Sequence, residues 1–203
     1  MGTVVFNMTM SLDGFVSGVN DNPEQGLGEN GDRLFNWYFK GDTEVSISAG
    51  VPSLKVPAES APLIQESLAT TGAGVWGRKT FDIAHGWGGK PPSSPAFIVS
   101  HSVAKEWVYD GSPFTFVTDG VESAIRQARA AAGAKNVVIC TANILQQCLN
   151  AGLVDEIHVD LAPVLLGRGV RLFEHLNIQP HDLEILRVIA TPLVTHISYR
   201  IVR

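Results

Sequence analysis

The sequence contains the stretch Ala73-Gly74-Val75-Trp76-Gly77-Arg78-Lys79-Thr80, in which an apolar run is followed at once by a glycine, two cations and a hydroxyl. The apolar half is typical of a buried strand, and the second half predicts the start of a helix. Free backbone N–H groups and the positive end of the helix dipole would face a ligand here, and Arg78 and Lys79 add full charges. We interpret the stretch as an anion site, with phosphate as the natural ligand. The alternative is a basic surface turn without a ligand.

On both sides of this stretch, apolar runs alternate with helix-forming segments. Strands are predicted over residues 3–10, 73–76, 96–99, 114–117, 136–139, 156–161, 183–189 and 195–202, and helices over residues 62–70, 143–150 and from Lys79 onward. A further helix is predicted after Asp119, which would cap it with Glu122 three residues later, and Gly133 would end it. The alternation predicts one α/β domain over residues 1–203, with a mostly parallel central sheet flanked by helices and a C-terminal antiparallel strand pair.

Small or polar residues stand where four of the predicted strands end, at Ser11, Gly77, Ser100 and Cys140. In open α/β sheets, ligands bind at the carboxyl ends of the strands. We therefore expect these positions to lie around the ligand site.

Residues 18–60 are rich in Gly, Asn, Asp, Pro and Ser, and they contain one aromatic cluster at residues 34–39. An irregular stretch of this length is more often a functional loop or lid than a linker. Two interpretations of the aromatic cluster stay open: it lines a ligand, or it forms a short helix that plugs the core.

Composition narrows the class of protein. The chain has 203 residues, 45% of them hydrophobic, which is enough for a sizeable core. Its formal net charge of −5 does not provide the basic face that general nucleic-acid binding needs. Cys140 and Cys148 make neither a disulfide framework nor a zinc pattern. Because the sequence shows no leader pattern and no run near the roughly 18 apolar residues of a membrane span, we expect a soluble cytoplasmic protein.

Several catalytic motifs are absent or unconvincing. The pattern G-x-G-x-x-G occurs over residues 26–31 and 72–77, but the first match has no strand before it and the second overlaps its strand. Neither match therefore predicts a dinucleotide fingerprint. The six histidines lack metal-ligand spacing, and no G-x-S-x-G motif is present. The sequence predicts no metal site and no serine-hydrolase chemistry.

Four ordered motifs give the chain a resemblance to a known family. They are Met10-Ser11-Leu12-Asp13-Gly14, residues 77–81 (GRKTF), residues 152–156 (GLVDE), and residues 163–167 (PVLLG) followed by Gly169 and Leu172-Phe173. Together they resemble the dihydrofolate-reductase-like superfamily. The closest resemblance is to the C-terminal reductase domain of the bifunctional deaminase-reductase of riboflavin biosynthesis and to its stand-alone bacterial relatives. It extends from Thr3 to Arg203, and the ordered set is specific although each motif alone is weak.

The resemblance implies a reductase that passes hydride from NADPH to a pyrimidine- or pteridine-like substrate, with 5-amino-6-(5-phosphoribosylamino)uracil as one candidate. It implies that the cofactor is bound by Gly77, Arg78, Lys79, Thr80, Ser100, His101, Cys140, Thr141, Ala142, Asn143 and Ile144. Ser100 and His101 would reach the adenosine 2′-phosphate, because a hydroxyl and an imidazole at a strand end suit a monoester phosphate.

The resemblance also implies a catalytic carboxylate at Asp13, as proton donor or anchor beside the substrate. The other substrate contacts would be Ser11, Trp37, Pro163, Leu165, Gly167 and Arg168. Judged from the residues alone, Asp13 is equally typical of a turn-forming residue before Gly14, and an exposed arginine such as Arg168 is usually only solvated.

The chain departs from the family pattern at one place. Relatives end the strand equivalent to residues 136–139 with Gly-Gly, whose peptide bond is commonly cis, whereas this chain has Cys140-Thr141. Side chains here crowd space that glycine leaves open beside the pyrophosphate. A rival function therefore stays open, a non-catalytic protein that binds a small ligand at a degenerate cofactor site. Cys140 would be either a reactive thiol at a helix start or a small residue that fills this space.

Three further expectations concern carboxylates and assembly. Asp155 and Glu156 begin a strand at the end away from the ligand edge, so we assign them structural roles. No convincing counterpart of the carboxylate on the first helix of dihydrofolate reductases is found, although Asp42 and Glu44 lie in the right region. The apolar C-terminal strands predict a homodimer, because relatives commonly bury such surface between two copies.

Overall fold

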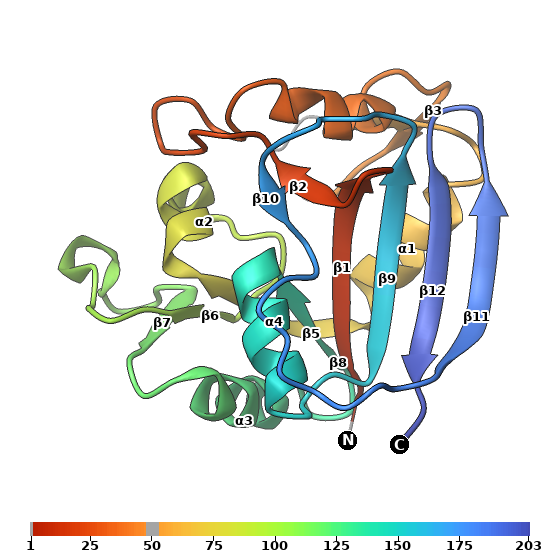
Figure 1. The fold of residues 1–203 in the computed structure, drawn as a ribbon. Coiled ribbons are helices and arrows are strands. Elements are labelled where there is room, and N and C mark those ends of the chain that lie inside the picture. Colours follow the sequence, from red (N-terminus) through yellow and green to blue (C-terminus); the bar gives the residue numbers. More distant parts are fainter. Residues whose placement is uncertain (1, 48–52) are drawn as a thin grey trace.

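A single eight-stranded sheet runs through the molecule (Figure 1). The computed structural model describes residues 2–47 and 53–203. The strand order is β11 (Leu183–Ala190), β12 (Thr195–Ile201), β9 (Glu156–Ala162), β1 (Val4–Ser11), β8 (Asn136–Cys140), β5 (Thr71–Gly77), β6 (Ala96–Val99) and β7 (Phe114–Val117). Strands β9 to β7 pair in parallel, and β12 and β11 add an antiparallel pair. The predicted fold class is confirmed.

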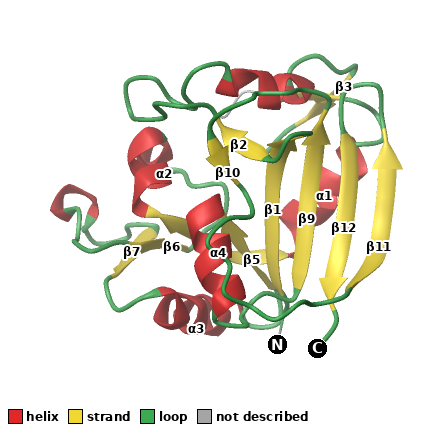
Figure 2. Ribbon diagram, viewed as in Figure 1, coloured by secondary structure: helices red, strands yellow, loops and turns green. Residues whose placement is uncertain are grey.

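Helices cover both faces of the sheet (Figure 2). Helices α3 (Val121–Ala132) and α4 (Ala142–Asn150) lie on one face, whereas α1 (Ala61–Thr70) lies on the other. The remaining elements are α2 (Arg78–Ile83), the 3-10 turns η1 (Gly31–Tyr38), η2 (His85–Gly89) and η3 (Lys105–Trp107), and two small antiparallel pairs, β2 (Phe15–Ser17) with β10 (Val170–Arg171) and β3 (Thr43–Val45) with β4 (Leu54–Val56).

The two faces of the central strands have different chemistry. Alternate residues of a strand point to opposite faces, so β1 sends Val4 and Phe6 into the core beneath α3 and α4 and sends Asn7 and Thr9 to the other face. On β9 the same alternation separates Val159, in that core, from Asp160. One face is therefore an ordinary apolar core, and the other carries polar side chains.

The long irregular segment contains more order than predicted. Residues 34–38 of its aromatic cluster fall in η1, where Leu34 and Trp37 are buried, and Phe39 follows directly. The short strands β3 and β4 also lie in this segment and were not predicted, because three-residue strands carry too little periodicity. Residues 48–52 of the segment lie outside the described residues.

Helix α3 starts one residue later than its predicted cap. Gly120 occupies the N-cap with φ 98°, and no cap bond from Asp119 is found among the described residues. The expected capping role of Asp119 is therefore wrong, because the chain enters the helix through a conformation that glycine adopts readily. Gly133 ends the helix as predicted, at φ 62°.

At the amino ends of the parallel strands, Asp155 has the expected structural role. Its Oδ2 accepts hydrogen bonds from the Val4 N–H, at 2.8 Å, and from Arg129, at 3.1 Å. Its Oδ1 lies 3.1 Å from Arg203. This carboxylate ties the two chain ends to α3.

Candidate functional site

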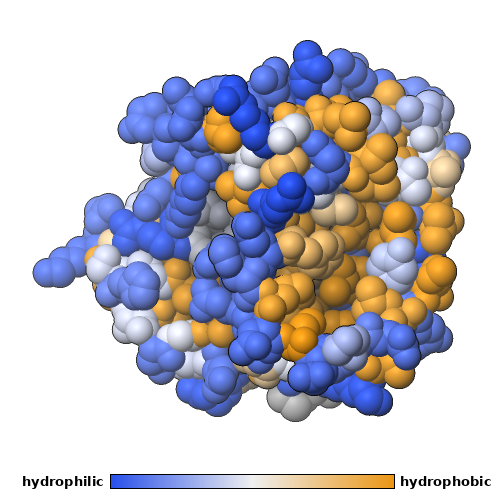
Figure 3. Space-filling view, viewed as in Figure 1, coloured by the Kyte–Doolittle hydropathy of each residue, from blue (hydrophilic) through white to orange (hydrophobic). Residues whose placement is uncertain are grey.

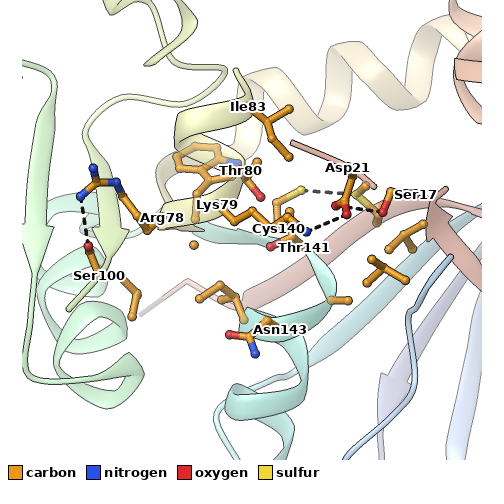
Figure 4. A pocket seen from close by; sticks show the side chains of 18 of the residues that line it. Ser17, Asp21, Arg78, Lys79, Thr80, Ile83, Ser100, Cys140, Thr141 and Asn143 are labelled. Carbon is orange, nitrogen blue, oxygen red and sulfur yellow. Dashed lines mark hydrogen bonds and ion pairs between the residues drawn. The ribbon is translucent and has the colours of Figure 1, made fainter. Parts of the chain in front are cut away.

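A cavity of about 1060 Å³ lies at the carboxyl edge of the parallel strands (Figure 4). The residues predicted to bind the cofactor all line it: Gly77, Arg78, Lys79, Thr80, Ser100, His101, Cys140, Thr141, Ala142, Asn143 and Ile144. They come from the ends of β5, β6 and β8 and from the helices or turns that follow. The structure thus brings residues 77–80, 100–101 and 140–144, which are far apart in sequence, into one wall.

Two full-length helices begin at this cavity. The N-caps of α3 and α4 are Gly120 and Thr141, which both line it, and neither makes a side-chain cap bond within the described part of the chain. The backbone N–H groups of a helix's first turn have no partner inside the helix, and the helix dipole adds positive potential there. Two uncapped helix starts beside Arg78 and Lys79 make the cavity suitable for a ligand with several negative charges.

The cations of α2 already have partners. The Arg78 Nε donates to Asp82 Oδ1 at 2.8 Å, and its Nη1 lies 3.5 Å from the Ser100 hydroxyl oxygen. The Lys79 Nζ lies 2.6 Å from Asp21 Oδ1, which reaches across the cavity mouth from the loop after β2 (Figure 4). A bound anion would therefore compete with Asp82 for Arg78 and with Asp21 for Lys79.

A second cavity of about 940 Å³ adjoins the first. It lies between the polar face of the sheet and the elements η1 and α1, and several residues line both cavities, among them Asn7, Phe35, Tyr38 and Cys140. The cluster in η1 thus fills both roles left open by the sequence. Leu34 is fully buried in the core, while Phe35 and Tyr38 line the cavities.

The aromatic side chains of η1 are held in place. The Trp37 Nε1–H donates to Thr9 Oγ1 at 3.2 Å, and the Trp37 ring packs edge-on against His196, with centroids 5.2 Å apart. Burial, and then the nearby charges of Asp160 and Cys140, raise the pKa of Tyr38 far above its ordinary value. The Tyr38 phenol is therefore a neutral group where the two cavities meet.

Most residues predicted to contact the substrate lie elsewhere. Trp37 lines the second cavity, whereas Ser11, Asp13, Pro163, Leu165, Gly167 and Arg168 lie outside the linings of both cavities in the part of the chain that the structure describes. Ser11 is fully buried, and Arg168 is exposed and pairs with Glu29 at 2.9 Å.

Asp13 connects two turns. Its carboxylate accepts the Ser11 hydroxyl at 2.6 Å and the backbone N–H groups of Leu166, at 3.1 Å, and Gly167, at 2.7 Å. Burial opposes ionisation, but these hydrogen bonds outweigh it and lower the pKa of Asp13. The geometry gives Asp13 a structural role, joining the turn after β1 to the turn after β9.

Comparison with protein families settles the kinship of the chain. The family model described as the RibD C-terminal domain matches residues 2–195. The chain belongs to the RibD C-terminal domain family. No curated protein matches the sequence.

Several solved structures share the architecture. A candidate riboflavin biosynthesis protein from Shewanella sp. PV-4 superposes with a TM-score of 0.69 at 21% identity, over 99% of each chain. A deaminase/5-amino-6-(5-phosphoribosylamino)uracil reductase from Thermotoga maritima gives 0.61 at 11% identity, over 99% of this chain and 57% of that one. The dihydrofolate reductase of Enterococcus faecalis, solved with NADP(H), gives 0.55 at 11% identity, over 98% and 96% of the two chains. At these identities the likeness shows the fold.

At the departure from the family pattern, the backbone of this chain has a conformation typical of glycine. Thr141 has φ 83° and ψ 154°, which is rare for any residue with a side chain and rarer for a β-branched one. The bond Cys140–Thr141 is not cis; the cis peptide bond among the described residues is Ser94–Pro95. Thr141, at the entry to α4, therefore holds a side chain in a backbone conformation that glycine adopts more readily.

The Cys140 thiol packs against Met8, with Sγ 3.5 Å from Sδ. Burial raises the pKa of Cys140 to about 11, so the reactive thiolate is scarce at neutral pH. Of the two interpretations of Cys140, the geometry favours the residue that fills space.

One polar cluster was not predicted from the sequence. Asp160 on β9 and His196 on β12 line the second cavity, and both are buried. They pair directly across the two strands in the sheet register. No short motif contains residues 36 positions apart, and a lone histidine in a strand gives no signal of its own.

Proposed function

We propose that this member of the family is an NADPH-dependent reductase of a pyrimidine-like heterocycle. The observation that supports this most is the first cavity, where the starts of α3 and α4 and the cations of α2 meet around one space. NADPH carries a pyrophosphate and a 2′-phosphate, and such a donor set suits both groups. The T. maritima relative is a reductase of a phosphoribosylamino-uracil, which supports the substrate class.

The chain's own residues fit the cofactor. The first turn of α4, from Ala142 to Ile144, would hold the pyrophosphate with its N–H groups, while Arg78 and His101 would surround the 2′-phosphate. Gly77 offers an open approach, because a Cβ there would come no closer than 3.5 Å to another atom among the described residues. When bound, NADPH would supply the hydride.

The protein's contribution to the chemistry would be positioning. Asn7 and Tyr38 line both cavities, so they lie where cofactor and substrate would come together. Holding two reactants in register removes much of the entropic barrier to their reaction. The buried ring of Trp37 lines the second cavity and would exclude water from that part of its wall.

Fluorescence titration tests the cofactor. We expect nicotinamide fluorescence to change and saturate when NADPH is added to the protein. We expect NADH, which lacks the 2′-phosphate, to bind at least about tenfold more weakly because it loses charge-assisted hydrogen bonds. No change at millimolar NADPH would overturn the reductase and favour the non-catalytic binding protein.

Complementation tests the substrate. A riboflavin-requiring bacterial strain that lacks the reductase activity should grow when it expresses this chain. Growth failure in cells that contain soluble protein able to bind NADPH would point to a different heterocycle.

We also propose a homodimer, formed through the sheet's antiparallel edge. Figure 1 shows α3 and α4 over one half of the sheet, while β12 and β11 lie bare on the same side. Apolar side chains gather over this region in Figure 3, and Leu183, Ile185 and Val188 of β11 are exposed. Light scattering at micromolar concentration should give twice the 21.8 kDa chain mass. A monomer would refute the dimer.

A further inference from the structure

Three buried side chains form a continuous hydrogen-bond chain that ends at the wall of the second cavity. Ser60 Oγ lies 2.8 Å from His196 Nε2, and His196 Nδ1 lies 2.6 Å from Asp160 Oδ1. The exposed fractions are 0% for Ser60, 5% for His196 and 7% for Asp160. The residues come from the start of α1, from β12 and from β9, so the fold alone brings them together.

The donors and acceptors of this chain follow from chemistry. A carboxylate oxygen accepts hydrogen bonds, so the His196 Nδ1–H donates a hydrogen bond to Asp160 Oδ1. In the neutral imidazole, Nε2 then accepts from the Ser60 hydroxyl. This assignment gives both ring nitrogens a partner and fixes the orientation of the ring.

Ser60 is diverted from the role that its position suggests. It is the N-cap of α1, where serine commonly bonds a backbone N–H of the first turn, yet its side chain makes no such bond among the described residues. Its hydroxyl is directed at His196 instead. The hydrogen bond to His196 thus replaces the local cap bond, so the hydrogen-bond chain is centred on the imidazole.

The hydrogen-bond chain has a direction. Asp160 and His196 line the second cavity. Ser60 is not among the described residues that line either cavity. A fully buried hydroxyl cannot attack a substrate, so the similarity to a Ser-His-Asp hydrolase ends with the order of the groups. The group presented to a ligand is the Asp160 carboxylate.

Among the residues that the structure describes, the Asp160 carboxylate has few hydrogen-bond partners and retains acceptor capacity. Its two oxygens offer about four acceptor positions in all. His196 takes one at 2.6 Å, and the Asn7 side-chain amide lies at 3.5 Å from Oδ2, too far for a strong bond. A buried carboxylate with unused lone pairs at a cavity wall favours a ligand that offers N–H groups.

We propose that Asp160 recognises the ring of the substrate through adjacent N–H donors, and that His196 and Ser60 are positioning residues that hold its carboxylate. The inference rests on the proposed reductase function and specifies its ring site. A 6-aminouracil ring fits this requirement, because its N1–H and its 6-amino group lie side by side. A ring edge made of carbonyl oxygens would face the carboxylate with acceptors alone and would be rejected.

Two small pyrimidines test the recognition directly. We expect 5,6-diaminouracil to bind at least about tenfold more tightly than uracil, measured by calorimetry in the presence of NADPH. Asp160→Asn keeps the size and one acceptor but replaces an oxygen with a donor, so the preference should fall to less than about threefold. Glu184→Gln is the matched control, since this carboxylate lies on the exposed strand β11 and should leave the preference unchanged.

Substitutions at His196 separate positioning from mere folding. Asn can place an amide N–H near the position of Nδ1, so His196→Asn should retain most of the preference, whereas His196→Phe should lose it. Ser60→Ala should have the mildest effect, because His196 keeps its bond to Asp160. If the Asn and Phe variants are equally folded by circular dichroism and equally selective, the positioning role is wrong.

A measurement on the unmodified protein covers the case in which a variant does not fold. Titration with 5,6-diaminouracil should shift the ¹⁵N resonances of the His196 ring, and uracil at the same concentration should not. The outcomes are separable from those of the proposed function. Tight NADPH binding without any preference between the two pyrimidines overturns this inference alone, whereas a clear preference without NADPH binding overturns the reductase.

Discussion

The polar groups of the two cavities are supplied in different ways. The first is lined by short consecutive segments at strand ends, such as residues 77–80 and 140–144, together with the starts of α3 and α4. The floor of the second is made of single side chains from separate strands, among them Asn7, Asp160 and His196. A cavity built from segments leaves a motif in the sequence. Polar groups that come singly from separate strands do not, because only the sheet register brings them together.

The largest expected effect separates the two cavities by charge. Arg78→Ala removes a guanidinium from the first cavity, so NADPH affinity should fall by about ten- to a hundredfold, the value of one or two charge-assisted hydrogen bonds. Nicotinamide fluorescence measures the change. Binding of 5,6-diaminouracil in the second cavity should stay within about threefold of its original value.

Lys135→Ala is the control for Arg78→Ala, since Lys135 is an exposed cation that precedes β8 at the opposite edge of the sheet. It should leave NADPH affinity unchanged. Equal losses in the two variants would mean that general positive charge, and not the first cavity, attracts the cofactor.

This contrast explains how much the sequence could predict. The alternation of apolar runs and helix formers gave the parallel sheet, and the motif at residues 77–81 led to the first cavity. Asp13 shows the limit: a motif located it correctly at the end of β1, but its carboxylate is taken up by the N–H groups of Leu166 and Gly167. Contacts between residues 153 or 154 positions apart depend on the folded path and leave no local pattern.

Asp160 and His196 mark the same limit from the other side. In sequence they are a lone aspartate and a lone histidine inside apolar strands, which usually indicates satisfied polar groups and no more. Their importance comes from three conditions that a single sequence does not contain: direct pairing between β9 and β12, burial, and a cavity on that face.

The second prediction concerns backbone strain at the first cavity. Thr141→Gly should raise the free energy of unfolding by about 1 kcal/mol, because a residue held at φ 83° and ψ 154° carries roughly 1–3 kcal/mol of strain and glycine loses part of this gain through its more flexible unfolded state. Urea denaturation measures the change.

Two matched glycine variants show whether the gain comes from strain. Thr115→Gly, in the exposed part of β7, should destabilise the protein, because glycine weakens a strand. Cys140→Gly should also destabilise it, since the packing of Cys140 against Met8 is lost. A destabilised Thr141→Gly variant would mean that other contacts of the Thr141 side chain outweigh the strain.

A smaller effect is expected where the loop after β2 reaches the first cavity. Asp21→Asn removes the carboxylate that holds Lys79, so a phosphate ligand no longer has to displace it, and inorganic phosphate and NADPH should both bind about two- to fivefold more tightly. The salt dependence of binding should become steeper, because Lys79 is free to pair with the ligand. Unchanged affinity would show that Lys79 does not meet the anion.

The smallest effect concerns thiol reactivity at the point where the cavities meet. With a pKa of about 11, Cys140 has on the order of one part in a thousand as thiolate at pH 8, so iodoacetamide should alkylate it slowly, and the rate should rise about tenfold per pH unit up to that pKa. Burial raises the pKa of Cys148 to about 12 in the same direction, which makes it the internal control. Because the neutral thiols are the buried forms, their contribution to stability is complete below the ordinary thiol pKa and is lost as the pH rises through 11 to 12.

Cys140 lines the first cavity, so NADPH should slow its alkylation at least about twofold and leave Cys148 unaffected. If mass spectrometry finds equal rates at Cys140 with and without saturating NADPH, the cofactor does not cover the end of β8, and the boundary between the two cavities lies elsewhere.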